Sequence, residues 1–238
     1  LTMPEEINRM VTDAITDYFF VTEKSAVKNL THEGRQRCYI HFVGHVMIDN
    51  LFHQMRRLES NDGLTFVTRD IKEKNPGYAF LTLHRPSNVD LKETFTEIAR
   101  AINTISAERP IFFPVHPRTK KMMAKHGIQF SERVILMPPL SFREALFLWK
   151  DSRIVLTDSG GLQEETTALK IPCLTLRENT ERPITVEIGS NIIAGTQTDA
   201  ILRAYREMLD RDGRTFRVPP KWDGMSSERI WSVLLNSR

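Results

Sequence analysis

The sequence predicts an α/β fold in which a parallel β-sheet is covered by helices on both of its faces. The first observation is that short apolar runs alternate with amphipathic segments from Gly77 onward. The second is that these runs are continuous rather than alternately apolar and polar, as in strands that are buried on both faces. The third is that most of the runs end in polar or charged residues, as expected for a sheet that binds ligands beyond the carboxyl ends of its strands.

The first part of the chain predicts a smaller group of elements. Pro4 stands at a plausible first helical position, and acidic residues follow it in the first turn. Apolar residues from Ile7 to Ile15 then recur at helical spacing. The segment Ser60–Gly77 is rich in turn-forming and charged residues, which predicts a surface segment or a crossover. The elements expected here are a helix beginning at Pro4, strands over Tyr18–Thr22 and Tyr39–Val43, a helix over Ser25–Glu33 that Gly34 closes, and a helix after Gly44.

Beyond Gly77 the expected strands and helices alternate almost without exception. The strands are expected over Tyr78–His84, Pro110–His116, Arg133–Pro139, Arg153–Thr157, Pro172–Arg177 and Asn191–Gly195. The helices are expected over Leu91–Ser106, Thr119–His126, Ser141–Lys150, Leu162–Leu169, Thr198–Leu209 and Ser226–Leu235.

Composition and charge narrow the classes of partner. With 238 residues, of which 40% are apolar and 26% charged, the chain is long enough for one or two hydrophobic cores. Its formal charge is only +3, and its basic residues are spread along the chain, which argues against a nucleic-acid partner. No apolar run is long enough to span a bilayer, so we expect a cytoplasmic protein without a membrane partner. Cys38 and Cys173 lie far apart, and we expect both to be reduced, buried thiols.

Polar residues gather where the expected strands end, which is where a parallel sheet would place a ligand. No metal-ligand spacing, P-loop or dinucleotide fingerprint occurs in the sequence, so neither a metal nor a cofactor is expected. The polar strand ends are His84-Arg85, His116-Pro117-Arg118, Met137 to Leu140, Asp158 to Gly161, and Arg177 to Arg182.

The turn Ser159-Gly160-Gly161 lies between an expected strand and an expected helix. Glycine has no Cβ atom, so a bulky anion can approach the free N–H groups at the start of the helix, where the helix dipole adds a favourable potential. Glu165 lies about one turn further along the helix, where a carboxylate suits the vicinal hydroxyls of a ribose. The alternative is an ordinary turn followed by a solvated pair of glutamates. Arg182, in the ENTERP segment, would supply a cation to a bound diphosphate, and this favours an anion-binding turn over an ordinary one.

Two histidines follow expected strands. His84 precedes Arg85, and such a pair at the end of a strand suits donors to a phosphate or a proton-transfer group. His116 is flanked by prolines, which indicates rigid placement, but a structural histidine bonded to a neighbouring carbonyl explains that pattern equally well.

Six segments of the chain follow one another in the order PEEINR, VGHVMID, TLHRPSNVD, FPVHPRT, LTDSGGLQEE and LRENTERPITVEIGSN, and WDGMSSERI stands near the end of the sequence. The six segments resemble, in the same order, motifs of the non-hydrolysing UDP-N-acetylglucosamine 2-epimerases, and WDGMSSERI resembles the ending of that family. The resemblance runs from Pro4 to Ile230, nearly the whole chain.

This resemblance implies a Rossmann-like, doubly wound parallel sheet that is one half of a GT-B-type two-domain architecture. It implies that residues 1–43 are the tail of the N-terminal Rossmann-like domain, that residues 44–222 form the C-terminal, UDP-binding domain, and that residues 223–238 form a helix that crosses back towards the N-terminal domain. About 100–150 residues of the N-terminal domain would then precede Leu1. We therefore expect this chain alone to be inactive, and the full-length enzyme to be a homodimer.

The activity that the resemblance implies is the interconversion of UDP-N-acetylglucosamine and UDP-N-acetylmannosamine for cell-surface polysaccharide precursors. A base removes the proton at C2 while UDP leaves the anomeric carbon, and the resulting 2-acetamidoglucal takes UDP back after proton return on the other face. The ligands would be UDP and a UDP-N-acetylhexosamine. By resemblance, the catalytic positions are matched by Glu5 and His84. The phosphate-binding turn is matched by Ser159, Gly160 and Gly161, a phosphate-binding arginine by Arg182, and the ribose carboxylate by Glu165, while the uracil would face Pro139 and Leu140. Positions that help to bind a second, activating UDP-N-acetylglucosamine are matched by Arg85 and His116.

Some features depart from the family pattern or leave alternatives open. His45 stands where the family often has asparagine, and Ser87 stands where it has glutamate, which would alter the loop near the diphosphate or the activating site. A helix-dipole role also explains Glu5, because it lies in a first turn. The alternative functions are a UDP-sugar-binding module without catalysis, a hydrolysing epimerase, a glycosyltransferase, and an epimerase of diacetamido-uronate nucleotides.

Overall fold

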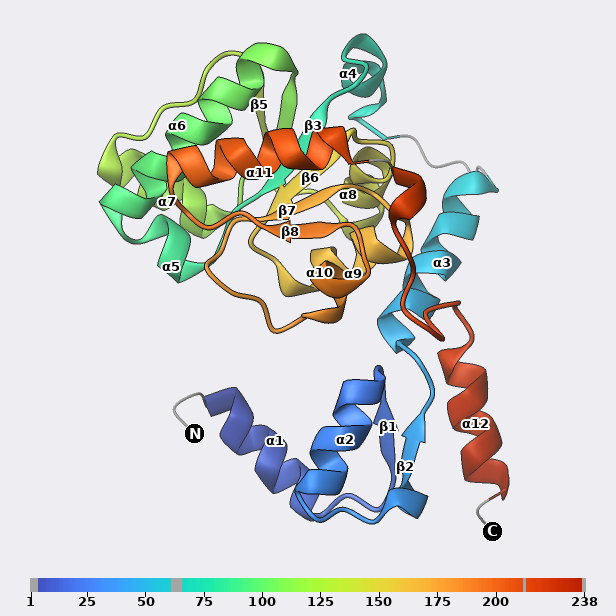
Figure 1. Cartoon of the computed structure of the whole chain (residues 1–238). Coiled ribbons are helices and arrows are strands. Elements are labelled where there is room, and N and C mark those ends of the chain that lie inside the picture. Colours follow the sequence, from blue (N-terminus) through green and yellow to red (C-terminus); the bar gives the residue numbers. More distant parts are fainter. Residues whose placement is uncertain (1–3, 61–65, 212, 237–238) are drawn as a thin grey trace. The chain divides into compact units, whose positions relative to one another are not determined.

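A computed structural model describes residues 4–60, 66–211 and 213–236 of the chain (Figure 1). The chain divides into two compact units. One comprises Leu1–Asn50 with Pro220–Arg238, and the other comprises Leu51–Pro219. The domain boundaries implied by resemblance, after residues 43 and 222, stay a prediction.

The smaller unit contains a two-stranded parallel sheet, with a helix in the connection between the strands. Leu30 of that helix packs with Phe19, Val21 and Ile40 into a small hydrophobic core. The elements of this unit are α1 (Pro4–Ala14), β1 (Phe19–Val21), α2 (Lys24–His32), η1 (Arg37–Tyr39), β2 (Ile40–Phe42), the start of α3 (Val46–Glu59), and α12 (Ser226–Asn236).

The C-terminal segment of this unit packs against the N-terminal one at Gly44. Gly44 has φ +99°, and a Cβ atom added to it would lie 2.0 Å from the carbonyl oxygen of Lys221, so only glycine permits this approach. Nearby, the indole of Trp222 donates a hydrogen bond to the carbonyl of Thr22 (3.2 Å), and Nζ of Lys221 donates to the carbonyl of Phe42 (2.6 Å). Residues that are almost the whole chain apart therefore build one small fold.

The larger unit is built on a six-stranded sheet in which every neighbouring pair of strands is parallel. In chain order the strands are β3 (Ala79–Thr82), β4 (Ile111–Pro114), β5 (Val134–Met137), β6 (Ile154–Thr157), β7 (Cys173–Thr175) and β8 (Asn191–Ile193). Their spatial order is β5-β4-β3-β6-β7-β8, so the chain first winds outward from β3 in one direction and then from β6 in the other.

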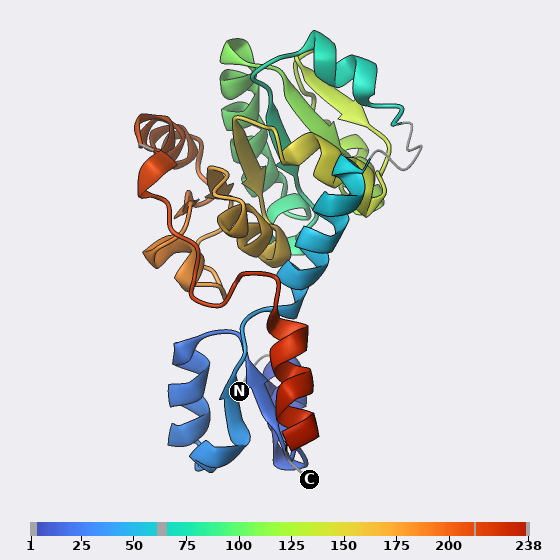
Figure 2. The same cartoon turned by 90° about the vertical axis from the view of Figure 1, so that its right-hand side faces the viewer.

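Helices cover both faces of this sheet, as Figures 1 and 2 show. The helices are α4 (Arg69–Lys74), α5 (Pro86–Val89), α6 (Lys92–Glu108), α7 (Pro117–His126), α8 (Phe142–Trp149), α9 (Gly160–Ala168), α10 (Ile184–Glu187) and α11 (Thr198–Asp210), followed by the short 3₁₀ helix η2 (Gly213–Thr215). One face carries α5, α6, α7 and α11, and the other carries α8, α9 and α10. This is a doubly wound sheet, as predicted.

The main hydrophobic core lies between the sheet and the α6–α11 layer, where Phe95, Ile102 and Phe113 are completely buried. Cys173 is buried as expected, and burial raises the pKa of its thiol to about 12. The expectation that both thiols are buried is wrong for Cys38, which is exposed in the short 3₁₀ turn η1 before β2. None of the helices in the described part of the chain combines the length and the apolar character that crossing a membrane requires.

Candidate functional site

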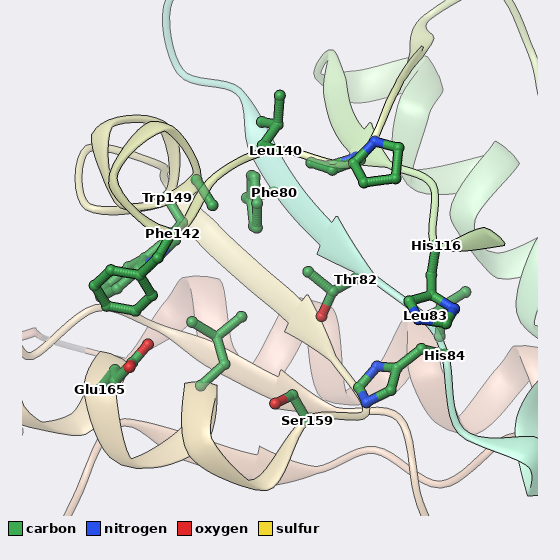
Figure 3. A pocket seen from close by; sticks show the side chains of 14 residues that line it. Phe80, Thr82, Leu83, His84, His116, Leu140, Phe142, Trp149, Ser159 and Glu165 are labelled. Atoms are coloured by element: carbon green, nitrogen blue, oxygen red, sulfur yellow. The ribbon is translucent and has the colours of Figure 1, made fainter. Parts of the chain in front are cut away.

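The centre of the six-stranded sheet is the point at which its winding direction reverses. The loops after β3 and β6 leave in opposite directions there, and in doubly wound sheets such a reversal opens a crevice beyond the carboxyl ends of the strands. A pocket of about 330 Å³ lies at this position (Figure 3). Six of the residues singled out in the sequence line it: His84, His116, Pro139, Leu140, Ser159 and Glu165.

One part of the pocket is apolar. Its wall consists of Phe80 from β3, Leu140 from the loop after β5, and Phe142 and Trp149 from α8. The side chain of Trp149 is buried, whereas Phe142 is partly exposed to solvent. Such a wall, next to the exposed backbone of the loop after β5, suits a planar, weakly polar ring.

The other part of the pocket is polar. His84 and His116 lie next to each other, with their ring centroids 5.8 Å apart. Nδ1 of His116 accepts a hydrogen bond from the backbone N–H of Arg118 (3.2 Å) and so caps α7. This capping bond accounts for the rigid placement of His116. It uses Nδ1, so Nε2 is the ring nitrogen that can contact a ligand.

The turn at Ser159 joins β6 to α9 and leaves donors at the start of that helix. The backbone N–H of Ser159 donates to Oγ1 of Thr157 (3.0 Å), whereas the hydroxyl of Ser159 does not cap the helix. Gly160 and Gly161 are the first two helical residues, and N–H groups in the first turn have no partner inside a helix. The donors that this turn offers to an anion are therefore the hydroxyl of Ser159 and the amides of the two glycines.

Asp158, for which the sequence pattern indicates only a place in a polar strand end, links β6 to the loop after β3. Its side chain is fully buried. Oδ2 accepts hydrogen bonds from the backbone N–H groups of His84 (2.9 Å) and Arg85 (2.8 Å) and from Nδ2 of Asn88 (3.3 Å). Oδ1 lies 2.9 Å from Nδ1 of His84. This contact orients the imidazole and leaves Nε2 as the nitrogen available to a ligand.

The two glutamates of α9 are buried, with exposed fractions of 3% for Glu164 and 7% for Glu165, so the alternative of a solvated pair is wrong. Glu164 is paired: its Oε1 lies 2.7 Å from Nε of Arg182. Glu165 faces the pocket (Figure 3), and burial, together with the charge of Glu164, raises its pKa to about 7. A carboxyl group in such an environment suits a ligand that donates hydrogen bonds.

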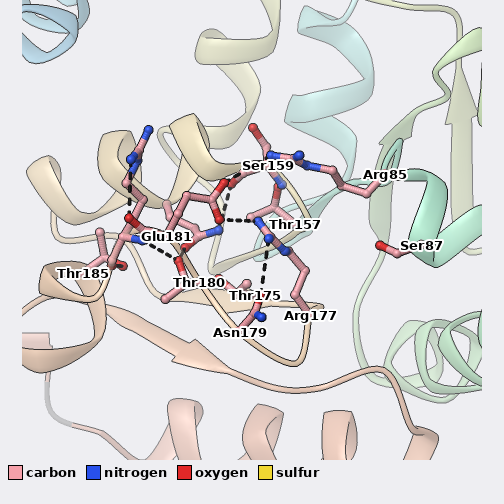
Figure 4. Close-up of polar contacts among 12 residues, drawn as sticks. Arg85, Ser87, Thr157, Ser159, Thr175, Arg177, Asn179, Thr180, Glu181 and Thr185 are labelled. Carbon is pink, nitrogen blue, oxygen red and sulfur yellow. Dashed lines mark hydrogen bonds and ion pairs between the residues drawn. The ribbon is translucent and has the colours of Figure 1, made fainter. Parts of the chain in front are cut away.

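The loop that carries Arg182 is anchored to α9 (Figure 4). The hydroxyl of Thr180 donates to Oε1 of Gln163 (2.6 Å) and accepts from the backbone N–H of Arg182 (2.9 Å). The same Oε1 accepts a bond from Nδ2 of Asn191 (3.3 Å). These hydrogen bonds hold the backbone at Arg182 against α9, the helix that begins with the two glycines.

Among the predicted residues of the larger unit, Arg85, Gly160, Gly161 and Arg182 are not part of the pocket lining. Arg85 points to the loop after β7, where its Nη2 lies 3.3 Å from Oε1 of Glu181. Ser87 lies in the short helix α5, and its hydroxyl donates to Oδ1 of its neighbour Asn88 (3.4 Å). Glu5 lies in α1 of the smaller unit, and its side chain falls outside the described part of the chain, so its role stays a prediction.

Comparison with known sequences identifies relatives over nearly the whole length of this chain. The sequence profile of a family described as UDP-N-acetylglucosamine 2-epimerase matches residues 1–235. A UDP-N-acetylglucosamine 2-epimerase of Methanococcus maripaludis is 37% identical over 242 residues, which cover 99% of this chain and 65% of that protein. A UDP-2,3-diacetamido-2,3-dideoxy-D-glucuronate 2-epimerase of Pseudomonas aeruginosa is 34% identical over 241 residues, covering 98% of this chain and 64% of that protein. The chain thus spans less than two thirds of the length of these relatives.

Solved structures agree with the sequence matches. The crystal structure of Methanocaldococcus jannaschii UDP-GlcNAc 2-epimerase in complex with UDP-GlcNAc and UDP superposes with a TM-score of 0.85 at 36% identity, over 98% of this chain and 65% of that one. These neighbours are GT-B-type proteins. The predicted fold class, a Rossmann-like doubly wound sheet of the GT-B type, is therefore confirmed.

Proposed function

Because this chain belongs to the UDP-N-acetylglucosamine 2-epimerase family, we propose that it is the UDP-binding portion of an enzyme that interconverts UDP-N-acetylglucosamine and UDP-N-acetylmannosamine. One observation carries this proposal. The pocket presents an apolar wall and the carboxyl group of Glu165, and it reaches Ser159, where the turn with the free glycine amides begins; these suit the three parts of UDP: uracil, ribose and diphosphate.

In the proposed complex the uracil lies beside the backbone of Pro139 and Leu140. The carboxylate of Glu165 accepts hydrogen bonds from the ribose hydroxyls. The diphosphate binds the amides of Gly160 and Gly161 and the hydroxyl of Ser159, where the start of α9 contributes a positive potential. Arg182, fixed by its ion pair with Glu164, adds a cation near this turn.

The proposed reaction is an elimination followed by readdition. A base takes the proton from C2, the C–H electrons form the C1–C2 double bond, and the C1–O bond breaks as UDP leaves. Proton return on the opposite face and attack by UDP at C1 give the epimer. Negative charge develops on the departing diphosphate, so the amides of α9 and the nearby arginine stabilise the transition state. His84, oriented by Asp158, would donate from Nε2 to that leaving group, and Glu5 would act at the sugar.

We extend the proposal to the organisation of the whole enzyme. Residues 1–43 would be the tail of an N-terminal domain, residues 44–222 the UDP-binding domain, and residues 223–238 a helix that crosses back. The enzyme would act in the cytoplasm as a homodimer and supply polysaccharide synthesis. Light scattering on the full-length enzyme tests the dimer, and a coupled assay with either hexosamine or diacetamido-uronate nucleotides identifies the sugar.

Arg182→Met tests the diphosphate assignment. We expect the variant to bind UDP about 10- to 100-fold more weakly than the unmodified chain, because a charge-assisted hydrogen bond contributes about 1.5–3 kcal/mol. Uridine has no phosphate, so its affinity should not change. Titration calorimetry with UDP and with uridine measures both effects.

The matched control is Arg211→Met, because Arg211 pairs with Glu207 on the surface at the C-terminal end of α11. That variant should bind UDP like the unmodified chain. A chain that binds no UDP, or an Arg182 variant with unchanged UDP affinity, would contradict the proposed placement of the diphosphate.

A further inference from the structure

The loop after β7 places a carboxylate of its own at the start of α9. Oε1 of Glu181 lies 3.0 Å from the position that a Cβ atom on Gly160 would take. The same carboxylate contacts two cations: its Oε2 lies 2.7 Å from Nη1 of Arg177, and its Oε1 lies 3.3 Å from Nη2 of Arg85 (Figure 4). Glu181 thus joins the loop after β3 to the turn that begins α9.

These surroundings are those of a bound anion. The start of α9 carries free amides and the positive end of the helix dipole. Two guanidinium groups converge on the same carboxylate, and Nε of Arg85 is buried without a hydrogen-bond partner among the described residues. Arg177 is well held, with its side chain only 18% exposed. The carboxylate of Glu181 therefore leaves at least Nε of Arg85 without an acceptor among the described residues.

Glu181 is ionised at neutral pH in this environment. Partial burial opposes ionisation, but its own backbone N–H and the charges of Arg177 and Arg85 lower its pKa below the ordinary value. A negative charge therefore already stands beside the amides to which a ligand phosphate would bind. A phosphate bound at these amides and the neighbouring carboxylate of Glu181 would repel each other, so a bound diphosphate disfavours the carboxylate in its present position.

We propose that Glu181 is an internal substitute for the diphosphate, which holds Arg85 and Arg177 in place until the ligand displaces it. On displacement, Arg177 becomes a ligand of the diphosphate, in addition to Arg182. This inference rests on the proposed function, because it requires UDP to bind at α9. It adds a positioning role for Glu181 and a specificity role for Arg177: both act on the diphosphate and neither acts on the nucleoside.

The substitution Glu181→Gln tests the competition. The variant keeps the size of the side chain and removes its charge, so the ligand no longer has to displace an ion-paired carboxylate. We expect the Kd for UDP to fall about tenfold, since that change needs only about 1.4 kcal/mol of relieved repulsion. The Kd for uridine should not change. Calorimetry with both ligands, after thermal unfolding has confirmed that the variant is folded, gives the two values.

Glu178→Gln is the matched control. Glu178 lies in the same loop, and its exposed side chain carries the same charge. Its Oε1, however, accepts hydrogen bonds from Thr196, from the backbone nitrogen at 3.0 Å and from Oγ1 at 2.7 Å. This variant should leave the UDP affinity within about twofold of the original, because an exposed charge outside the site is largely screened.

The substitution Arg177→Met tests independently whether Arg177 binds the diphosphate. Loss of the guanidinium should raise the Kd for UDP about tenfold and leave that for uridine unchanged. If the unmodified chain binds no UDP, the proposed function itself fails. If the unmodified chain binds UDP but the Glu181→Gln variant binds UDP equally well or more weakly, the proposed function stands and the role of Glu181 as a substitute for the diphosphate is wrong. Unchanged UDP affinity in Arg177→Met would likewise overturn the role of Arg177.

Discussion

Replacing Asp158 with alanine is expected to lower the free energy of unfolding of the six-stranded unit by about 3–5 kcal/mol. The carboxylate is fully buried and accepts hydrogen bonds from the backbone N–H groups of His84 and Arg85 and from the amide of Asn88. Its removal deprives the backbone N–H groups of His84 and Arg85 of this acceptor and leaves Asn88 with its bond to the carbonyl of Leu176 (2.8 Å), and each buried donor without a partner costs about 1–3 kcal/mol. Urea denaturation followed by circular dichroism measures the loss.

The substitution Asp158→Asn separates the structural contribution from the functional one. Asparagine keeps the shape and one acceptor oxygen, so we expect a smaller loss of stability, about 1–3 kcal/mol. The orientation of His84 should still be lost, because the amide no longer holds Nδ1 as the carboxylate does. We therefore expect weaker UDP binding and a changed tautomer of His84 in ¹⁵N NMR spectra.

The control for both substitutions of Asp158 is Asp199→Ala, at an exposed position of α11. It should change the free energy of unfolding by less than about 1 kcal/mol. If Asp158→Asn kept the original stability, UDP affinity and His84 tautomer, the carboxylate of Asp158 would not be the group that organises the site.

Glu165→Gln is expected to stabilise the protein and to weaken nucleoside binding at the same time. Burial and the charge of Glu164 raise the pKa of Glu165 from 4.5 to about 7. The folded chain therefore keeps a proton that the unfolded chain releases, and the stability of the fold declines as the pH rises from 4.5 through about 7. Glutamine has no charge to bury, so the variant should avoid this loss.

Measurement of the unfolding free energy against pH tests the stability effect. The variant and the unmodified chain should be about equally stable near pH 4.5, and the variant should be more stable by roughly 2–3 kcal/mol near pH 8. Both UDP and uridine carry the ribose, so both should bind about tenfold more weakly to the variant, in contrast to Arg182→Met. Glu132→Gln, at an exposed position, is the control. Parallel stability curves for variant and original would contradict the burial of a charge at Glu165.

Much of the fold could be predicted from the sequence because its strands and long helices carry strong patterns. The six strands of the larger unit and helices such as α6 and α11 lie within a few residues of their expected ranges. The helices α4, α5 and α10 were not predicted, because segments of four to six residues show no helical period. Part of the segment Ser60–Gly77, residues 61–65, lies outside the described residues.

The candidate site was predictable where its residues are consecutive in the sequence, and it was not where they meet only in space. Ser159, Gly160 and Gly161 carry a local pattern for a phosphate-binding turn. The partners of Asp158 lie 70 to 74 residues earlier, and they meet it because β3 and β6 are neighbours, which the order of elements alone does not reveal. Glu181 and Arg85 are 96 residues apart, and they meet because the loops after β3 and β7 both reach the start of α9, which follows the strand β6 between them.

The most direct test of the whole account is a crystal structure of this chain with UDP. We expect diphosphate oxygens within about 2.7–3.2 Å of the amide nitrogens of Gly160 and Gly161, the ribose beside Glu165, and the uracil beside Leu140. A nucleotide bound with its phosphates away from the start of α9 would contradict the account.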